Sequence, residues 1–98
     1  MISLNAKRRI NGIHIIGVGS LDQVNVEPRE VFAAALMNNA AAIIAFHNHP
    51  SGDPVPSPAD FAITRRLQEA GEIMNIRVLD HLVIGEGRFY SMREGGSL

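Results

Sequence analysis

The residues best suited to chemistry lie between positions 47 and 60, in the stretch HNHPSGDPVPSPAD. His47 and His49 are separated by one residue, and Asp60 follows after a proline-rich loop. Side chains two apart at the end of a strand project from the same side, so both imidazoles can face one point. Asp60 falls in the first turn of an expected helix, from which its carboxylate can point back toward the sheet. These side chains would form a three-ligand metal site, and the open fourth position is typical of catalytic zinc, which lowers the pKa of bound water to about 7.

The same residues also support plainer interpretations. Two histidines close together in a loop are more often surface residues than metal ligands. Ser57 and Asp60 have the spacing of a capping box, in which the serine caps a helix and the acid bonds the serine N–H. An aspartate in the first helical turn is also favoured by the helix dipole. The two interpretations compete for one carboxylate: if Asp60 bonds only the Ser57 backbone, it is not a ligand.

The elements that must position these residues follow from hydrophobic periodicity. Residues 12–18 are rich in β-branched side chains and predict a strand, while residues 7–11 should turn and residues 1–5 should form part of an edge strand. Pro28 opens a helix because proline suits the first helical turn. An apolar stripe follows at Val31, Phe32, Ala35 and Leu36. Residues 40–46 are a continuous apolar run, which favours a buried central strand that ends just before His47.

The second half of the chain continues the alternation. Ser57 and Pro58 begin a second helix, in which Ile63, Leu67, Ala70 and Met74 recur at the helical period. Residues 76–84 and 88–92 predict two further strands, and residues 94–98 should fray. This order predicts an α/β fold with a mixed sheet sandwiched by helices. The central strand then delivers His47 at its carboxyl end, where ligands bind in open α/β sheets.

Composition narrows the class of protein. The 98 residues favour a single domain over residues 1–98, with no cysteine to form disulfides. The formal net charge of −1 argues against nonspecific nucleic-acid binding. No apolar run approaches the ~20 residues that span a bilayer, and no signal peptide is evident, so we expect a cytoplasmic protein without membrane contact.

The joint spacing of the polar residues is more specific than any of its parts. His47-x-His49-Pro50, a spacer and Ser57-x-x-Asp60 resemble the JAMM motif of the JAB/MPN metalloprotease family. Three further segments resemble one branch of that family, the bacterial RadC-like proteins (the UPF0758 group): residues 28–32, the run from residue 41 through HNHPSGDP, and residues 79–91. The resemblance covers nearly the whole chain.

The resemblance carries expectations about fold and function. It implies a cytidine-deaminase-like, three-layer α/β sandwich in which His47, His49 and Asp60 bind Zn²⁺. Ser57 would act in catalysis by hydrogen-bonding the attacking water or the oxyanion. The implied reaction is hydrolysis of an amide or isopeptide bond in a protein or peptide substrate.

One family feature has no match. JAMM enzymes use a glutamate from a strand upstream of the first helix, yet residues 1–20 contain no acidic side chain. We infer that the glutamate-bearing strand lies upstream of Met1. Turnover should then be strongly reduced, since a positioned general base contributes about 10²–10⁴-fold to the rate. An unpaired sheet edge left by the missing strand would favour a homodimer.

Alternatives remain open at this stage. The chain could be a noncatalytic MPN-like module for protein contacts, or a DNA-repair accessory, as the RadC name suggests. His14 is expected on a solvated face, and Asp53 is expected to form a turn. His81 is interpreted as a hydrogen-bonded structural histidine, with an indirect role behind a metal ligand as the alternative.

Overall fold

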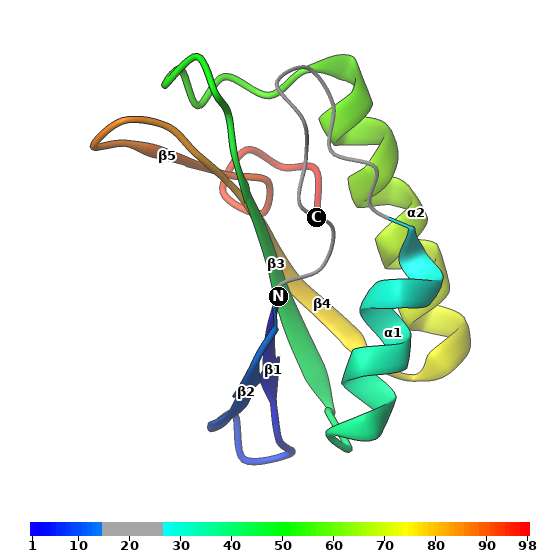
Figure 1. The fold of residues 1–98 in the computed structure, drawn as a ribbon. Helices are drawn as coiled ribbons and strands as arrows, with labels where there is room; N and C mark the ends of the chain where they lie inside the picture. The colour runs from blue at the N-terminus through cyan, green and yellow to red at the C-terminus, as the bar shows by residue number, and fades with distance from the viewer. Residues whose placement is uncertain (15–26) are drawn as a thin grey trace.

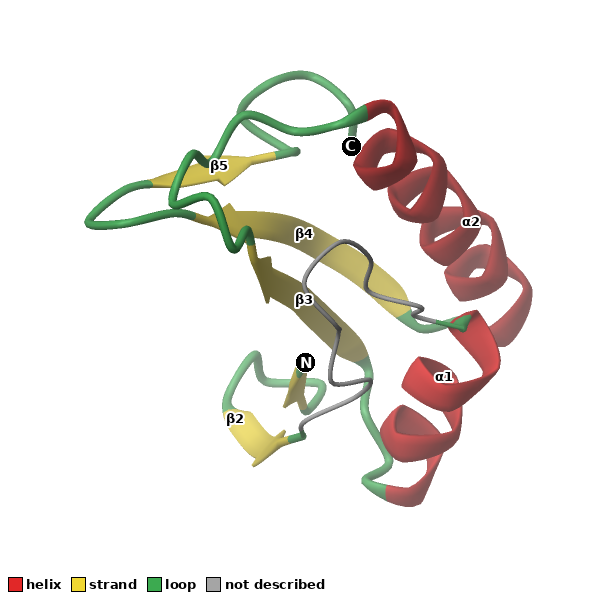
Figure 2. Cartoon of the chain, turned by 45° about the horizontal axis from the view of Figure 1, so that its top comes forward, coloured by secondary structure: helices red, strands yellow, loops and turns green. Residues whose placement is uncertain are grey.

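The computed structural model describes residues 1–14 and 27–98. Within them, five strands form one sheet in the order β2-β1-β3-β4-β5, and two helices lie together on one face of it (Figure 1, Figure 2). The elements are β1 (Ile2–Leu4), β2 (Ile10–Ile13), α1 (Pro28–Met37), β3 (Ala42–Asn48), α2 (Pro58–Met74), β4 (Arg77–Ile84) and β5 (Phe89–Ser91). β3 runs parallel to β4 and the other pairs are antiparallel, so the predicted α/β fold with a mixed sheet is confirmed. The described elements supply the sheet and one helical layer of the expected sandwich.

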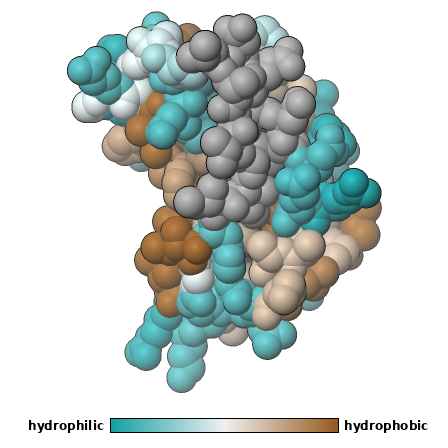
Figure 3. Space-filling view, in the orientation of Figure 1, coloured by the Kyte–Doolittle hydropathy of each residue, from teal (hydrophilic) through white to brown (hydrophobic). Residues whose placement is uncertain are grey.

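The N-terminal hairpin differs from the sequence prediction. β1 is not an edge strand, because it lies between β2 and β3. The turn is shorter than predicted: the Asn5 side chain accepts the backbone N–H groups of Lys7 and Arg9, and Arg8 is left-handed with φ 62°. β2 therefore begins at residue 10 and is the outermost described strand on this side of the sheet, and the predicted strand beyond residue 14 lies outside the described residues. Figure 3 shows hydrophobic side chains gathered above the polar tip of this hairpin.

β3 is the central strand, as predicted, but its limits differ. It begins at Ala42 and continues through Asn48, because its pairing with β4 extends to Asn48 opposite Ile84. His47 therefore lies inside the strand rather than in the loop after it. Alternate residues of β3 point toward the helices: Ile43 and Ala45 belong to the core, and His47 is the next position on that face.

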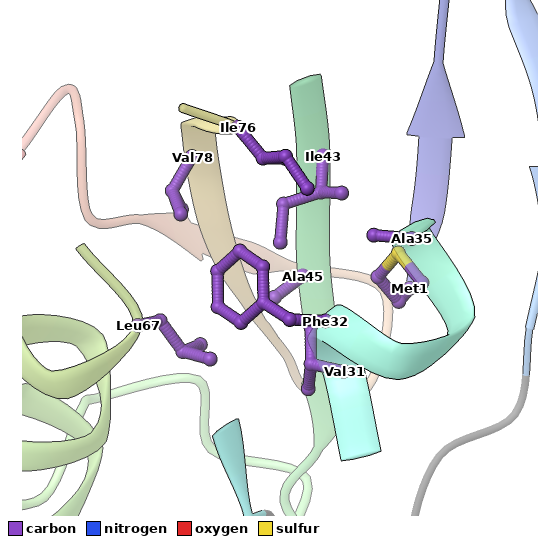
Figure 4. Packing of buried hydrophobic residues seen from close by; sticks show 9 residues of the cluster. All are labelled: Met1, Val31, Phe32, Ala35, Ile43, Ala45, Leu67, Ile76 and Val78. Atoms are coloured by element: carbon purple, nitrogen blue, oxygen red, sulfur yellow. The ribbon is translucent and has the colours of Figure 1, made fainter. Parts of the chain in front are cut away.

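The core lies between the sheet and the two helices (Figure 4). α1 contributes Val31, Phe32 and Ala35 as predicted, but Leu36 is 49% exposed. α2 contributes Leu67, with Ile63 and Ala70 packed against the same cluster, whereas Met74 is 39% exposed. The core side of α2 also carries polar residues, since Asp60 and Thr64 are buried on the turns that precede Leu67. These polar positions are the part of α2 that faces the carboxyl end of β3.

The C-terminal tail is ordered, contrary to the expected fraying. The Ser97 N–H donates to the Met92 carbonyl at 2.8 Å, and Leu98 packs against the core cluster. Neither described helix is long and apolar enough to cross a membrane.

Candidate metal centre

Three side chains converge where the carboxyl end of β3 meets the first turn of α2. His47 Nε2 lies 2.9 Å from Asp60 Oδ1, and His49 Nε2 lies 2.9 Å from Asp60 Oδ2. One ligand atom from each residue lies within 4.8 Å of the other two. Zinc ligands lie about 2.0–2.2 Å from the ion, so nitrogen and oxygen atoms 2.9 Å apart are close enough to share it. The structure thus brings His47, His49 and Asp60 together as the sequence predicted, and the group could hold a metal ion.

Asp60 also caps α2, so the two interpretations of this carboxylate are compatible. Ser57 is the N-cap residue, and its Oγ accepts the Asp60 N–H at 3.2 Å. In return, the Ser57 N–H donates to Asp60 Oδ2 at 2.7 Å, which completes the predicted capping box. The cap fixes the rotamer of a carboxylate that faces both imidazoles. Helix initiation and ligand placement therefore depend on the same residue pair.

The hydrogen bond made by His49 Nδ1 bears on the form in which His49 Nε2 faces Asp60. His49 Nδ1 lies 2.8 Å from the backbone carbonyl oxygen of Asp53. A carbonyl oxygen can only accept, so Nδ1 carries the proton. Its Nε2 faces Asp60 Oδ2 at 2.9 Å. In the neutral ring this nitrogen directs a lone pair at an oxygen that also accepts, an arrangement that a cation between the two atoms would stabilise, whereas in the protonated ring it would donate to the oxygen.

His47 is supported from behind by a second imidazole. His47 Nδ1 lies 2.9 Å from His81 Nε2 on the neighbouring strand β4, and His81 Nδ1 lies 2.6 Å from the Thr64 hydroxyl on α2. His81 and Thr64 are both buried, at 3% and 1% exposure. His81 is therefore a hydrogen-bonded structural histidine, as interpreted from the sequence, and its partner is a candidate metal ligand.

Burial and neighbouring groups together shift the pKa values of His47, His81 and Asp60. Burial lowers the pKa of His47 below its usual value, although the Asp60 carboxylate opposes the shift. Burial and the neighbouring His47 lower the pKa of His81 to about 4. Burial acts to raise the pKa of Asp60, but the Ser57 N–H and His47 outweigh it, so this carboxyl has a pKa below its ordinary value. These shifts favour the neutral imidazole of His47 and the ionised carboxylate of Asp60, the forms that metal ions require.

The loop that carries His49 is anchored on the turn between β4 and β5. The His49 N–H donates to the Ile84 carbonyl at 2.9 Å, and the Glu86 N–H donates to the Gly52 carbonyl at 2.8 Å. Gly85 lies so close to this loop that a Cβ would meet the Gly52 carbonyl oxygen and Pro54. The absence of a side chain at position 85 therefore permits the close approach that positions the second imidazole.

Other sequence candidates lie outside the group. His14 is half-buried and contacts the Asn38 side chain at the end of α1. Asp53 forms a turn as predicted, since its Oδ1 accepts the Val55 N–H, and it contributes its carbonyl rather than its carboxylate to the site. Sequence analysis did not single out Thr64. Its position four residues after Asp60, on the same face of the helix, is the sequence signal that could have placed it near the site.

A mixed α/β sheet that presents a His-His-Asp group at the carboxyl end of its central strand defines a candidate metal-binding domain. Residues 1–97 match the model of the family described as RadC-like JAB domain, and the chain belongs to this family.

Curated relatives show the same relationship. A UPF0758 protein of Moorella thermoacetica is 56% identical over 93 residues, which cover 95% of this chain and 41% of the relative. A UPF0758 protein of Pelobacter propionicus is 55% identical over 98 residues, which cover 100% of this chain and 43% of the relative. The chain thus spans about two fifths of the length of these relatives.

Proposed function

We propose that this chain is the zinc-binding domain of a JAMM-type hydrolase that cleaves amide or isopeptide bonds in protein or peptide substrates. The observation that carries the proposal is the arrangement around Asp60: two imidazole nitrogens lie 2.9 Å from its two carboxylate oxygens. The resemblance of the motif to the JAMM metalloproteases supports zinc as the ion. When bound, zinc supplies Lewis acidity toward a carbonyl oxygen and lowers the pKa of water.

The chain's own residues define the remaining roles. Ser57 Oγ accepts the Asp60 N–H, and among the described residues its hydroxyl hydrogen has no acceptor. That hydrogen is free to donate to a substrate carbonyl oxygen as negative charge develops on it. Removing one such donor typically costs about 10²–10³-fold in rate. We therefore propose that Ser57 stabilises the oxyanion, while the capping box keeps it beside the metal ligands.

The general base is the part of the mechanism that the described residues do not supply. Asp60 is the one carboxylate in the described His-His-Asp group, and its oxygens are engaged with Ser57 and the two imidazoles. For this reason we expect turnover to be about 10²–10⁴-fold slower than in an enzyme with a positioned base.

Hydrolysis is tested with zinc-loaded chain on a mixture of peptides and isopeptide-linked peptides, with products identified by mass spectrometry. We expect slow cleavage that chelator abolishes and Ser57→Ala reduces. Ser57→Thr is the matched control, since it keeps the hydroxyl and a residue suited to the helix cap. Stoichiometric zinc without any cleavage would instead favour the noncatalytic MPN-like module.

A role as a DNA-repair accessory would not require direct DNA contact. The net charge of −1 provides little of the phosphate neutralisation that drives nonspecific binding, so we propose that the partner is a protein. Filter binding at physiological salt tests this proposal, and micromolar or tighter affinity for DNA would contradict it.

A further inference from the structure

The described residues contain a line of hydrogen bonds that ends on the candidate metal ligand His47. The line starts at the Asp60 backbone carbonyl, passes through the Thr64 hydroxyl at 2.7 Å and His81 Nδ1 at 2.6 Å, and reaches His47 Nδ1 from His81 Nε2 at 2.9 Å. It joins the backbone of one ligand residue to the ring of another, through α2 and β4. None of these intervening groups lies in the motif HNHPSGDPVPSPAD.

The direction of the protons along this line follows from its first member. The Asp60 carbonyl can only accept, so the Thr64 hydroxyl donates to it. The Thr64 oxygen then accepts from His81, which places the His81 proton on Nδ1. An imidazole that carries its proton on Nδ1 presents Nε2 as an acceptor, here toward His47 Nδ1 at 2.9 Å. His47 must therefore donate from Nδ1, which leaves the lone pair of His47 Nε2 directed at Asp60 Oδ1.

We propose that His81 and Thr64 are positioning residues that hold His47 as the Nδ1–H tautomer, with its Nε2 lone pair ready for the metal. The inference rests on the proposed metal site. His81 is suited to the task because its surroundings fix it: its side chain is buried, and its backbone N–H donates to Asp80 Oδ1 at 2.7 Å. A side chain held in this way orients His47 without touching the ion.

The alternative placement of the protons, on Nε2 of both His81 and His47, provides a test. If Thr64 had no hydroxyl, His81 could move its proton to Nε2 and donate to His47 Nδ1, and His47 Nε2–H could then donate to Asp60. Thr64→Val removes the hydroxyl at nearly constant shape. We expect this variant to change metal-free His47 from the Nδ1–H to the Nε2–H tautomer. Nitrogen-15 NMR of the imidazoles at pH 8 in chelator distinguishes the two forms directly.

Zinc affinity provides the second readout, measured by competition with a chelating dye. Loss of such a partner behind a histidine ligand typically weakens metal binding 10–100-fold. We expect a loss of that size for His81→Leu and Thr64→Val, and a smaller loss for His81→Gln, whose amide can accept from His47 and donate to Thr64. His14→Leu is the matched control, because it removes a histidine with a polar contact outside the site.

The two readouts separate the inference from the function on which it rests. Wild-type protein that binds no zinc would overturn the proposed function, whereas the tautomer measurement needs no metal. A metal-free wild-type His47 in the Nε2–H form would overturn the inference, as would unchanged tautomer and zinc affinity in Thr64→Val. Thermal unfolding in chelator shows whether each variant is folded. If His81→Leu does not fold, Thr64→Val and His81→Gln still decide the outcome.

Discussion

Replacement of Asp60 by asparagine tests whether the carboxylate is a metal ligand or part of an ion-pair network. Its oxygens accept the Ser57 N–H at 2.7 Å and lie 2.9 Å from Nε2 of His47 and of His49. If both rings are neutral and direct lone pairs at the carboxylate, the charge of Asp60 stabilises little in metal-free protein. If the rings are protonated, that charge is a buried counter-ion, since Asp60 is 7% exposed.

The two cases differ in magnitude. Asparagine keeps an oxygen for the Ser57 N–H, and its amide can donate to the His47 lone pair, a gain of about 1 kcal/mol. It loses the interaction of a charge with the helix N-terminus, which is worth about 0.3–1 kcal/mol. The expected net change in the free energy of unfolding is therefore near zero. Breaking a buried ion pair would instead cost about 3–5 kcal/mol.

The assay is thermal unfolding followed by circular dichroism at pH 8, first in chelator and then with zinc. A change of 1 kcal/mol shifts the melting temperature of a domain this size by about 4–8 °C, so the two cases are well separated. With zinc at 100 times its dissociation constant, wild-type stability should rise by about 2.7 kcal/mol, and Asp60→Asn should show little of this rise.

Asp60→Ala is the comparison that isolates the helix cap. It removes the acceptor of the Ser57 N–H and should cost about 1 kcal/mol even in chelator. A loss of 3 kcal/mol or more in metal-free Asp60→Asn would refute our interpretation, because the carboxylate would then be paired with protonated rings rather than kept for a cation.

Three other changes test contacts elsewhere in the fold and in the loop that carries His49. Gly71→Ala should lower stability by about 1–3 kcal/mol in urea unfolding, because its Cβ would lie 2.5 Å from the Ile76 carbonyl oxygen; a more stable variant would contradict this contact. Gly85→Ala should displace the Gly52 loop and weaken zinc binding, and unchanged affinity in the dye competition would count against that anchor. We also propose that a second copy of the chain pairs along β2, where Ile13 is 69% exposed. Light scattering should then show a dimer, and Ile13→Lys should dissociate it. A wild-type monomer at high protein concentration would contradict the proposal.

Local sequence was sufficient to predict that His47, His49 and Asp60 lie together. His47 and His49 follow a continuous apolar run, and Asp60 follows a capping serine, so strand alternation and the first helical turn direct all three side chains to one place. These are short-range rules, and the structure obeys them. The central strand and both helices were predicted for the same reason.

The support behind His47 depends on long-range pairing, which periodicity does not specify. His81 faces the site because the register of β3 and β4 shifts between Ile43 and Ile44, which sets Ala45 opposite His81. The misplaced edge strand has a similar origin. Alternating hydrophobicity identifies two neighbouring strands but not which one is outermost, and that choice depends on the pairing of β1 with β3.

The most direct test of the metal site is the zinc content of protein purified without chelator, measured by mass spectrometry for wild type, His47→Ala and His49→Ala. His14→Ala serves as the control, since His14 lies outside the group. We expect close to one zinc ion per chain in wild type and control, and loss of the ion in both ligand variants. Metal-free wild-type protein that takes up no added zinc, or zinc retained by both ligand variants, would contradict the account.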